Sequence, residues 1–144
     1  MRALMRNRIV ALCLAIVLVA SAGCGSGKKK TCIVRGKVTY DGKVVPNGTI
    51  TFFPTEGPSA SGEIQPDGSY TLTTYVAGDG AVEGAYTVVI VAMRDESGRL
   101  PEERNPLPPP IVPNKYTSAA TSDLRAEVKA GENTLNFHLE KEKK

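Results

Sequence analysis

Apolar and polar side chains alternate in short runs between residues 34 and 139, with the period of two that is typical of half-buried β-strands. The run 85–92 (AYTVVIVA) is apolar on both faces, so it predicts a central strand that is covered on both sides. Turn signals such as Asp41-Gly42 and Pro66-Asp67-Gly68 separate the runs. The predicted strands are 34–40, 49–53, 61–64, 69–75, 85–92, 124–129 and 135–139.

The same pattern predicts how the strands assemble. No stretch after residue 30 has sustained i, i+3, i+4 apolar spacing, so almost no helix is expected. Short strands that follow one another at intervals of roughly 8 to 12 residues are typical of an antiparallel β-sandwich. The 144 residues suffice for one small hydrophobic core. We therefore expect an all-β domain at residues 31–140, followed by a charged tail at 141–144.

The N-terminal segment has a different pattern. Residues 1–8 contain three arginines and no acidic residue, and residues 9–20 (IVALCLAIVLVA) form an apolar run of 12 residues. A membrane-spanning helix needs about 20 apolar residues, whereas a basic start, a short apolar stretch and then small residues are typical of a secretory signal. We therefore expect export, with residues 1–23 forming a signal helix that precedes the domain.

This segment ends in small residues and a cysteine. Ser21-Ala22-Gly23-Cys24 resembles the signal of bacterial lipoproteins, although Ser21 stands where that signal prefers leucine. The resemblance implies cleavage before Cys24, lipidation of that residue and stable anchoring in a membrane, because two or more acyl chains bind a bilayer firmly. Gly25 is not the aspartate that the sorting pattern associates with the inner membrane, which favours the outer membrane or cell surface. An ordinary cleaved signal and an uncleaved anchor are the alternatives.

Residues 24–30 are expected to form a flexible tether between this anchor and the domain. Its lysines at positions 28–30 fit contact with anionic head groups and fit a soluble spacer equally well. Without the three arginines of the signal, fifteen basic side chains stand against fifteen acidic ones. A neutral domain lacks the positive field that attracts phosphate backbones, so no nucleic-acid partner is expected.

Several motifs of the predicted strands and turns recur in one known family. The motifs are 34–45 (VRGKVTYDGKVV), 48–52 (GTITF), 66–70 (PDGSY) and 84–88 (GAYTV), and over about residues 31–140 the chain resembles the carboxypeptidase regulatory-like, transthyretin-like (prealbumin-like) domain. Small exported lipoproteins built from one such domain share the stretches 113–116 (PNKY) and 131–137. The resemblance implies a seven-stranded antiparallel sandwich of Greek-key type with a non-catalytic accessory, adhesive or packing role. Turn and strand motifs specify a fold but no ligand.

Few residues are candidates for catalysis or metal binding. His138 is the only histidine and alternation places it on the surface, so neither a Ser-His-Asp relay nor an imidazole zinc site is expected. Asp67, Asp79 and Glu83 lie in or near turns, but a calcium ion needs about six to eight oxygen ligands, and turn chemistry explains these residues. Cys32 is interpreted as an apolar filler rather than a reactive thiol. We expect no catalytic residue, cofactor or metal.

A proline-rich segment is the remaining candidate for a partner site. The loop 101–116 contains Pro108, Pro109, Pro110 and Tyr116. Such a loop fits a stiff arm that docks on a partner, and it also fits an insertion that packs along a sheet edge. The expected function is a lipid-anchored, non-catalytic envelope module with a structural or interaction role, which contacts the membrane through Cys24 and an envelope protein or glycan. The alternative is a carbohydrate- or peptide-binding module that uses the loop 101–116.

Overall fold

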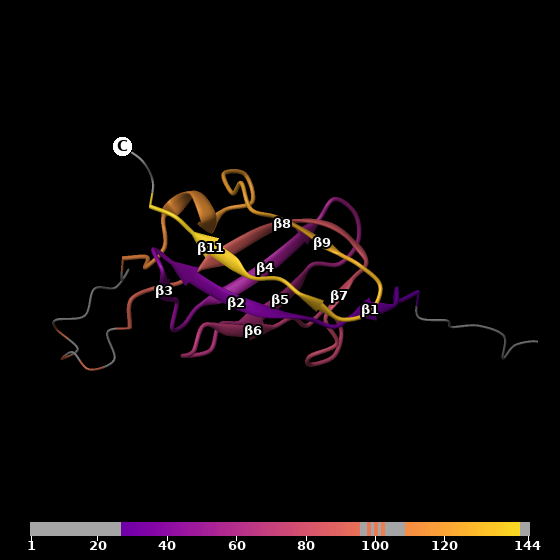
Figure 1. Ribbon diagram of the computed structural model, residues 1–144, viewed down its shortest axis with the longest axis horizontal. Coiled ribbons are helices and arrows are strands. Elements are labelled where there is room, and N and C mark those ends of the chain that lie inside the picture. Colours follow the sequence, from indigo (N-terminus) through magenta and orange to yellow (C-terminus); the bar gives the residue numbers. More distant parts are fainter. Residues whose placement is uncertain (1–26, 96–97, 99, 101, 103–108, 142–144) are drawn as a thin grey trace, which may run out of the picture.

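The computed structural model describes residues 27–141 except 96–97, 99, 101 and 103–108. These residues form β-strands joined by short connections and contain no α-helix, as the apolar periodicity predicts. Most of the strands form two facing sheets, with the tether at one end and the last described residues at the other (Figure 1). The predicted signal helix at 1–23 lies outside the described residues. Within those residues, no helix is long and apolar enough to cross a membrane.

One sheet is built around β2 (Val34–Tyr40), which matches the first predicted strand. On one side of it lie β3 (Lys43–Val44) and β6 (Ser69–Thr71), both antiparallel to β2. Asp41 and Gly42 join β2 to β3, and their φ values of 51° and 77° fit a type I′ turn. This turn matches the right-handed twist of the strands that it joins, so the predicted turn closes a tight hairpin.

The other side of β2 departs from the sequence prediction. One antiparallel strand is expected at 135–139, but the structure has β10 (Asn133–Thr134) and β11 (Phe137–Leu139), both parallel to β2. Between them the side-chain Oδ1 of Asn136 accepts the amide hydrogen of Lys37 at 2.9 Å. Alternation identifies a strand but not the direction of its partner. The expectation of a wholly antiparallel sandwich is therefore wrong at this strand.

The second sheet is antiparallel throughout, in the order β5–β4–β8–β9. Val88, Val89 and Ile90 are consecutive buried residues of β8, which confirms the prediction of a strand covered on both faces. The four strands are β4 (Thr49–Pro54), β5 (Ala60–Glu63), β8 (Gly84–Val91) and β9 (Arg125–Val128).

Short elements that have no periodicity of their own complete the fold. β1 (Thr31–Cys32) pairs with β7 (Ala81–Val82) where the tether joins the domain. At the opposite end, the 3-10 helix η2 (Asn114–Thr117) lies against β8. A strand of two residues shows no alternation, so the sequence does not indicate β1, β3 or β7.

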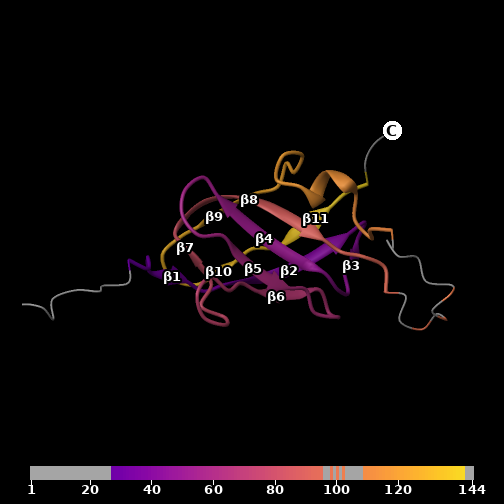
Figure 2. The same ribbon diagram turned by 180° about the vertical axis from the view of Figure 1, so that it is seen from behind.

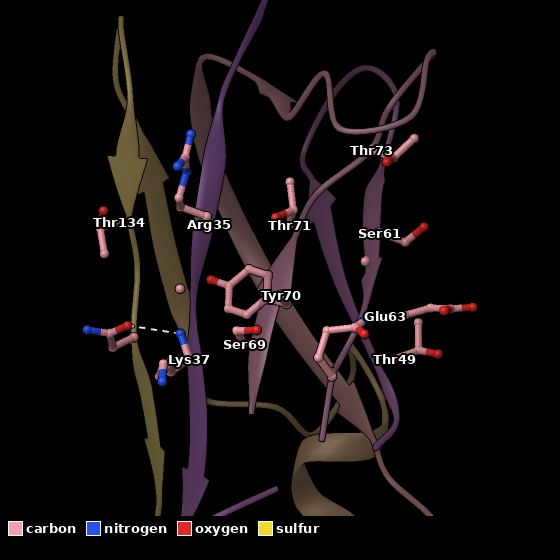
Figure 3. A pocket seen from close by; sticks show the side chains of 14 residues that line it. Arg35, Lys37, Thr49, Ser61, Glu63, Ser69, Tyr70, Thr71, Thr73 and Thr134 are labelled. Carbon is pink, nitrogen blue, oxygen red and sulfur yellow. Dashed lines mark hydrogen bonds between the residues drawn. The ribbon is translucent and has the colours of Figure 1, made fainter. Parts of the chain in front are cut away.

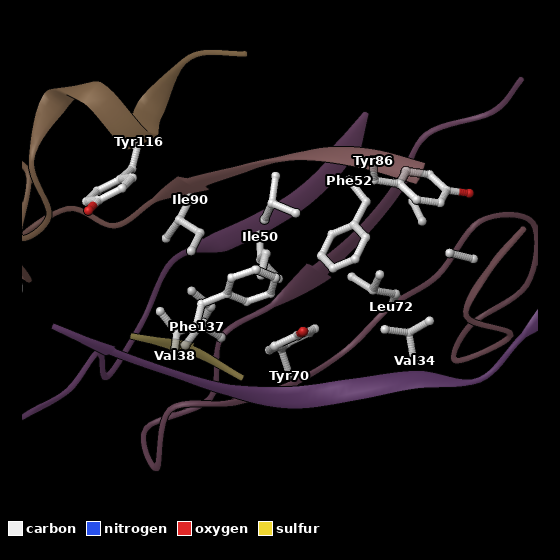
Figure 4. Packing of buried hydrophobic residues seen from close by; sticks show 14 of the residues in the cluster. Val34, Val38, Ile50, Phe52, Tyr70, Leu72, Tyr86, Ile90, Tyr116 and Phe137 are labelled. Atoms are coloured by element: carbon white, nitrogen blue, oxygen red, sulfur yellow. The ribbon is translucent and has the colours of Figure 1, made fainter. Parts of the chain in front are cut away.

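The hydrophobic core lies between the two sheets (Figure 4). Phe52 of β4 is fully buried, and its ring centroid lies 5.9 Å from that of Phe137 and 5.6 Å from that of Tyr86. The ring of Tyr70 lies 6.5 Å from Phe52, so aromatic contacts join β4 and β8 to β6 and β11. Aliphatic side chains of both sheets fill the space around these rings, among them Val34, Val38, Ile50, Leu72, Val88, Ile90, Val128 and Leu139.

Candidate binding groove

A groove of about 1010 Å³, lined mainly by residues with polar side chains, lies on the flank of the sandwich, where residues of both sheets meet (Figure 3). The sheets are linked at this edge by a bridge between Ser61 of β5 and Thr73, which lies two residues beyond β6. The amide of each bonds the carbonyl oxygen of the other, at 3.0 and 2.8 Å. The predicted strand 69–75 is thus regular only as far as Thr71. The described lining residues are Arg35, Gly36, Lys37, Thr49, Ser61, Gly62, Glu63, Gln65, Ser69, Tyr70, Thr71, Thr73, Thr134 and Asn136.

Strand alternation explains why this lining is polar. Arg35 and Lys37 are exposed on β2, between residues that point into the core. On β6, Tyr70 is buried while Ser69 and Thr71 lie on the outer face. The lining therefore offers hydroxyl, amide and charged groups, and the described residues of the groove include no histidine or cysteine. Outward positions on β4, β5 and β10 add Thr49, Ser61, Glu63 and Thr134.

Two glycines allow the strands around the groove to approach closely. A Cβ at Gly36 would lie 1.8 Å from the carbonyl oxygen of Leu135, and a Cβ at Gly62 would lie 2.4 Å from that of Thr71. The Tyr70 hydroxyl donates to the same Leu135 oxygen at 2.6 Å. A side chain at either glycine would push backbone segments apart. The two glycines therefore set the spacing of the strands that line the groove.

Charged side chains lie along two sides of the groove. Arg35 and Lys37 follow one side, 3.6 Å from Glu132 and 3.5 Å from Asp67 respectively. Glu63 lies on the other side, on β5 (Figure 3). Both ion pairs are more than half exposed, so each contributes little to stability. The cationic groups can therefore exchange these partners for a ligand at little cost to the fold.

None of the described residues of the predicted partner loop lines the groove. These residues lie at the end of the sandwich opposite the tether (Figure 1). Pro109 and Pro110 are exposed, while Pro108 lies outside the described residues. The amide of Arg94 donates to the carbonyl oxygen of Pro109 at 3.2 Å, and a β-bridge joins Pro110 to Met93. This pairing favours the interpretation of the loop as an insertion held along the sheet edge.

Tyr116 belongs to the core and not to the surface of that loop. Only 3% of the residue is exposed. Its hydroxyl oxygen accepts the amide hydrogen of Glu140 at 3.4 Å, and the ammonium group of Lys115 lies 4.4 Å from its ring centroid. The ring is therefore not available to a partner in this structure, and a partner that binds this loop would have to contact other residues.

The other residues considered for catalysis or metal binding include Cys32, His138 and Asp79. Cys32 is buried and forms no disulfide. His138 is exposed, as alternation predicts, with Nδ1 2.8 Å from the hydroxyl oxygen of Thr39. The Asp79 carboxylate accepts backbone amide hydrogens of its own loop. Across the part of the chain that the structure describes, no group of three or more His, Cys, Asp or Glu residues is placed to hold a metal ion. Cys24, the predicted lipidation site, lies outside that part.

No family model matches the chain, and neither the curated proteins nor the solved structures give a match. The likeness to transthyretin-like domains therefore rests on the sequence motifs, while the structure shows a small all-β sandwich. No local pattern of the sequence indicates the groove. Outward Ser and Thr residues are visible in the alternation, but only the pairing of β2, β5 and β6 brings them together.

Proposed function

We propose that this protein is a lipid-anchored, non-catalytic module of the cell envelope, with a Greek-key domain of the transthyretin-like, carboxypeptidase regulatory-like type. Support comes from the lipoprotein-like signal that ends at Cys24, the short tether and the sandwich with its continuous core. Acyl chains on Cys24 hold the domain at the outer membrane or cell surface. The role of the domain is to bind another envelope component.

The polar groove is the surface that makes this contact, and its ligand is a glycan. Sugar hydroxyls both donate and accept hydrogen bonds, as do the hydroxyl and amide groups along the groove. Arg35 and Lys37 suit acidic substituents on the sugar. The hydrogen-bonding side chains of the lining are the observation that carries this proposal, and they favour the groove over the loop 101–116 as the binding site.

Anchoring is tested with Cys24→Ala, and Cys13→Ala serves as the matched control because Cys13 lies within the predicted signal. The first variant should lose the acyl modification and membrane retention, whereas the second should keep both. Membrane fractionation and mass spectrometry of the N-terminal peptide give the readout. Unchanged retention of the Cys24→Ala protein, with no lipid on the wild-type N-terminus, would contradict the proposal.

Glycan binding is tested on an array of envelope polysaccharides with the mature protein. Arg35→Gln, Lys37→Gln and Thr71→Val should each weaken binding severalfold, while Lys43→Gln and Thr55→Val, which alter residues outside the groove lining, should not. Thermal unfolding of each variant checks that the fold is intact. Equal binding by groove and control variants would overturn the assignment, and binding of envelope peptides alone would replace the glycan with a peptide.

A further inference from the structure

The end of the sandwich where the tether enters carries a loop at residues 74–80, which we call the tether-end loop. The ammonium group of Lys28 lies 5.4 Å from the ring centroid of Tyr75, so the tether runs beside this loop. A Cβ at Gly80 would lie 1.8 Å from the carbonyl oxygen of Cys32 and 2.8 Å from the Cα of Ile33. The loop, β1 and the tether therefore lie next to one another; Figures 1 and 2 show this end of the domain from two sides.

The tether-end loop is held in shape by its own hydrogen bonds. The Asp79 carboxylate accepts the amide hydrogens of Thr74, Tyr75 and Val76 at 2.7, 3.0 and 3.1 Å. The Thr74 hydroxyl donates to the carbonyl oxygen of Gly80 at 2.7 Å. Bonds at both ends of the loop thus fix the direction in which its tip points.

The fixed tip presents an apolar side chain to the outside. Val76 is 66% exposed, more than any other large apolar residue among those described, and Ile33 beside the loop is 36% exposed. A well-ordered turn gains nothing in water from an exposed valine, whereas burial of that side chain in another apolar phase is favourable. This tip therefore has the character of a contact surface.

Charges around this tip favour an anionic surface as its partner. Lys28 is exposed beside the loop, and the exposed Lys29 and Lys30 follow it in the tether. The Asp79 carboxylate is turned toward the loop amides, away from a surface that would meet the tip. Glu56 and Glu83 lie with Lys29 around a separate small hollow. An apolar tip beside a cluster of lysines is the combination that binds an interface of anionic lipids.

We infer that the tether end of the domain lies against the bilayer, with Val76 and Ile33 entering the boundary between head groups and acyl chains and the three lysines contacting anionic lipid head groups. This inference rests on the proposed anchor at Cys24, which brings the surface within reach of the membrane through a tether of only a few residues. The domain then has a fixed orientation, and the groove opens on the flank of a docked module.

The test places an environment-sensitive fluorophore on the full mature lipoprotein in nanodiscs, in a Cys32→Ser background. A label at Val76→Cys should be shielded from water and quenched by spin-labelled lipid, whereas a label at Met93→Cys should not. Met93 is a matched control because it is 43% exposed and pairs with Pro110 of the loop 101–116, away from the tether. Equal quenching at the two positions, or none at Val76→Cys, would overturn the inference while leaving the anchor intact.

Lipid composition tests the role of the lysines. Nanodiscs of phosphatidylcholine with phosphatidylglycerol should show docking, and replacing one lysine of 28–30 with Gln should lower the ratio of docked to undocked protein about fivefold. Pure phosphatidylcholine should reduce docking without releasing the protein. Docking that is insensitive both to lysine replacement and to anionic lipid would refute the electrostatic part of the inference. Release of the unaltered protein from the membrane would instead refute the proposed anchor.

Discussion

The hydroxyl of Tyr70 joins segments that lie 65 positions apart in the sequence, because it donates to the carbonyl oxygen of Leu135 at 2.6 Å. Burial raises the pKa of this hydroxyl, so it stays protonated and remains a donor at any physiological pH. Tyr70→Phe would leave the carbonyl oxygen of Leu135 without this partner. We expect the free energy of unfolding to fall by about 1 to 3 kcal/mol, measured by urea denaturation.

Tyr75→Phe is the control for this change, since Tyr75 is half-buried at the edge of the domain. Its effect should stay within about 0.5 kcal/mol. An equal loss in both variants would show that the Tyr70 hydrogen bond is not what stabilises β6 against the last strand. Alternation within the predicted strand 69–75 places Tyr70 on the same face as Leu72, which is the apolar face of that strand. It could not predict the bond to Leu135, which depends on the parallel pairing of β10 and β11 with β2.

At the scale of elements, alternation predicted the longer strands well. The predicted strand 34–40 is identical to β2, and 85–92 differs from β8 by one residue at each end. The parallel pairing of the last strand was not predictable, because side-chain periodicity carries no information on strand direction. The structure of the tether-end loop could not be predicted either. In the sequence Asp79 resembles an ordinary turn residue, but its carboxylate accepts three amide hydrogens that hold the loop in shape.

The tether-end loop should loosen in acid because of Asp79. Partial burial raises the pKa of this carboxyl, but hydrogen bonds from the amides of Thr74, Tyr75 and Val76 outweigh that effect and hold the pKa below its ordinary value. A lowered folded-state pKa stabilises the loop above the unfolded pKa of about 3.9, and this contribution is lost as the pH falls through the folded pKa. Amide hydrogen exchange at residues 74–76 should therefore accelerate, relative to the rest of the sandwich, below about pH 4.

Asp79→Asn separates titration from other effects of acid. The variant should show faster exchange at residues 74–76 already at neutral pH, and its relative exchange should no longer change between neutral pH and about pH 3. Asp123→Asn, at an exposed ion pair with Lys115 outside the loop, should leave this region unaffected. If Asp79→Asn keeps the acid response of the unaltered protein, another group controls the loop.

For the whole molecule, the position of the candidate binding site could not be predicted from the sequence. The sequence identified the loop 101–116 as the candidate partner site because its prolines are conspicuous, whereas the groove is assembled from residues between 35 and 136 that no local pattern connects. Their proximity depends on strand order, on close approach at Gly36 and Gly62, and on the bridge from Ser61 to Thr73. Each of these is a tertiary property.

Replacing residues 96–108 with a short Gly-Ser turn distinguishes the two candidate sites, because it removes Pro108 and half of the loop 101–116 and leaves the groove lining unchanged. The bonds from Arg94 to Pro109 and from Ile111 to Ala92 close the base of the loop, so the sandwich should keep its stability. Halving a loop changes its closure free energy by only about 0.6 kcal/mol, which thermal unfolding would register as a small shift. The shortened protein should bind glycan as the full chain does, while Lys37→Gln in the same background should weaken binding. Loss of glycan binding on shortening alone would indicate that the binding site lies in the proline-rich loop and not in the groove.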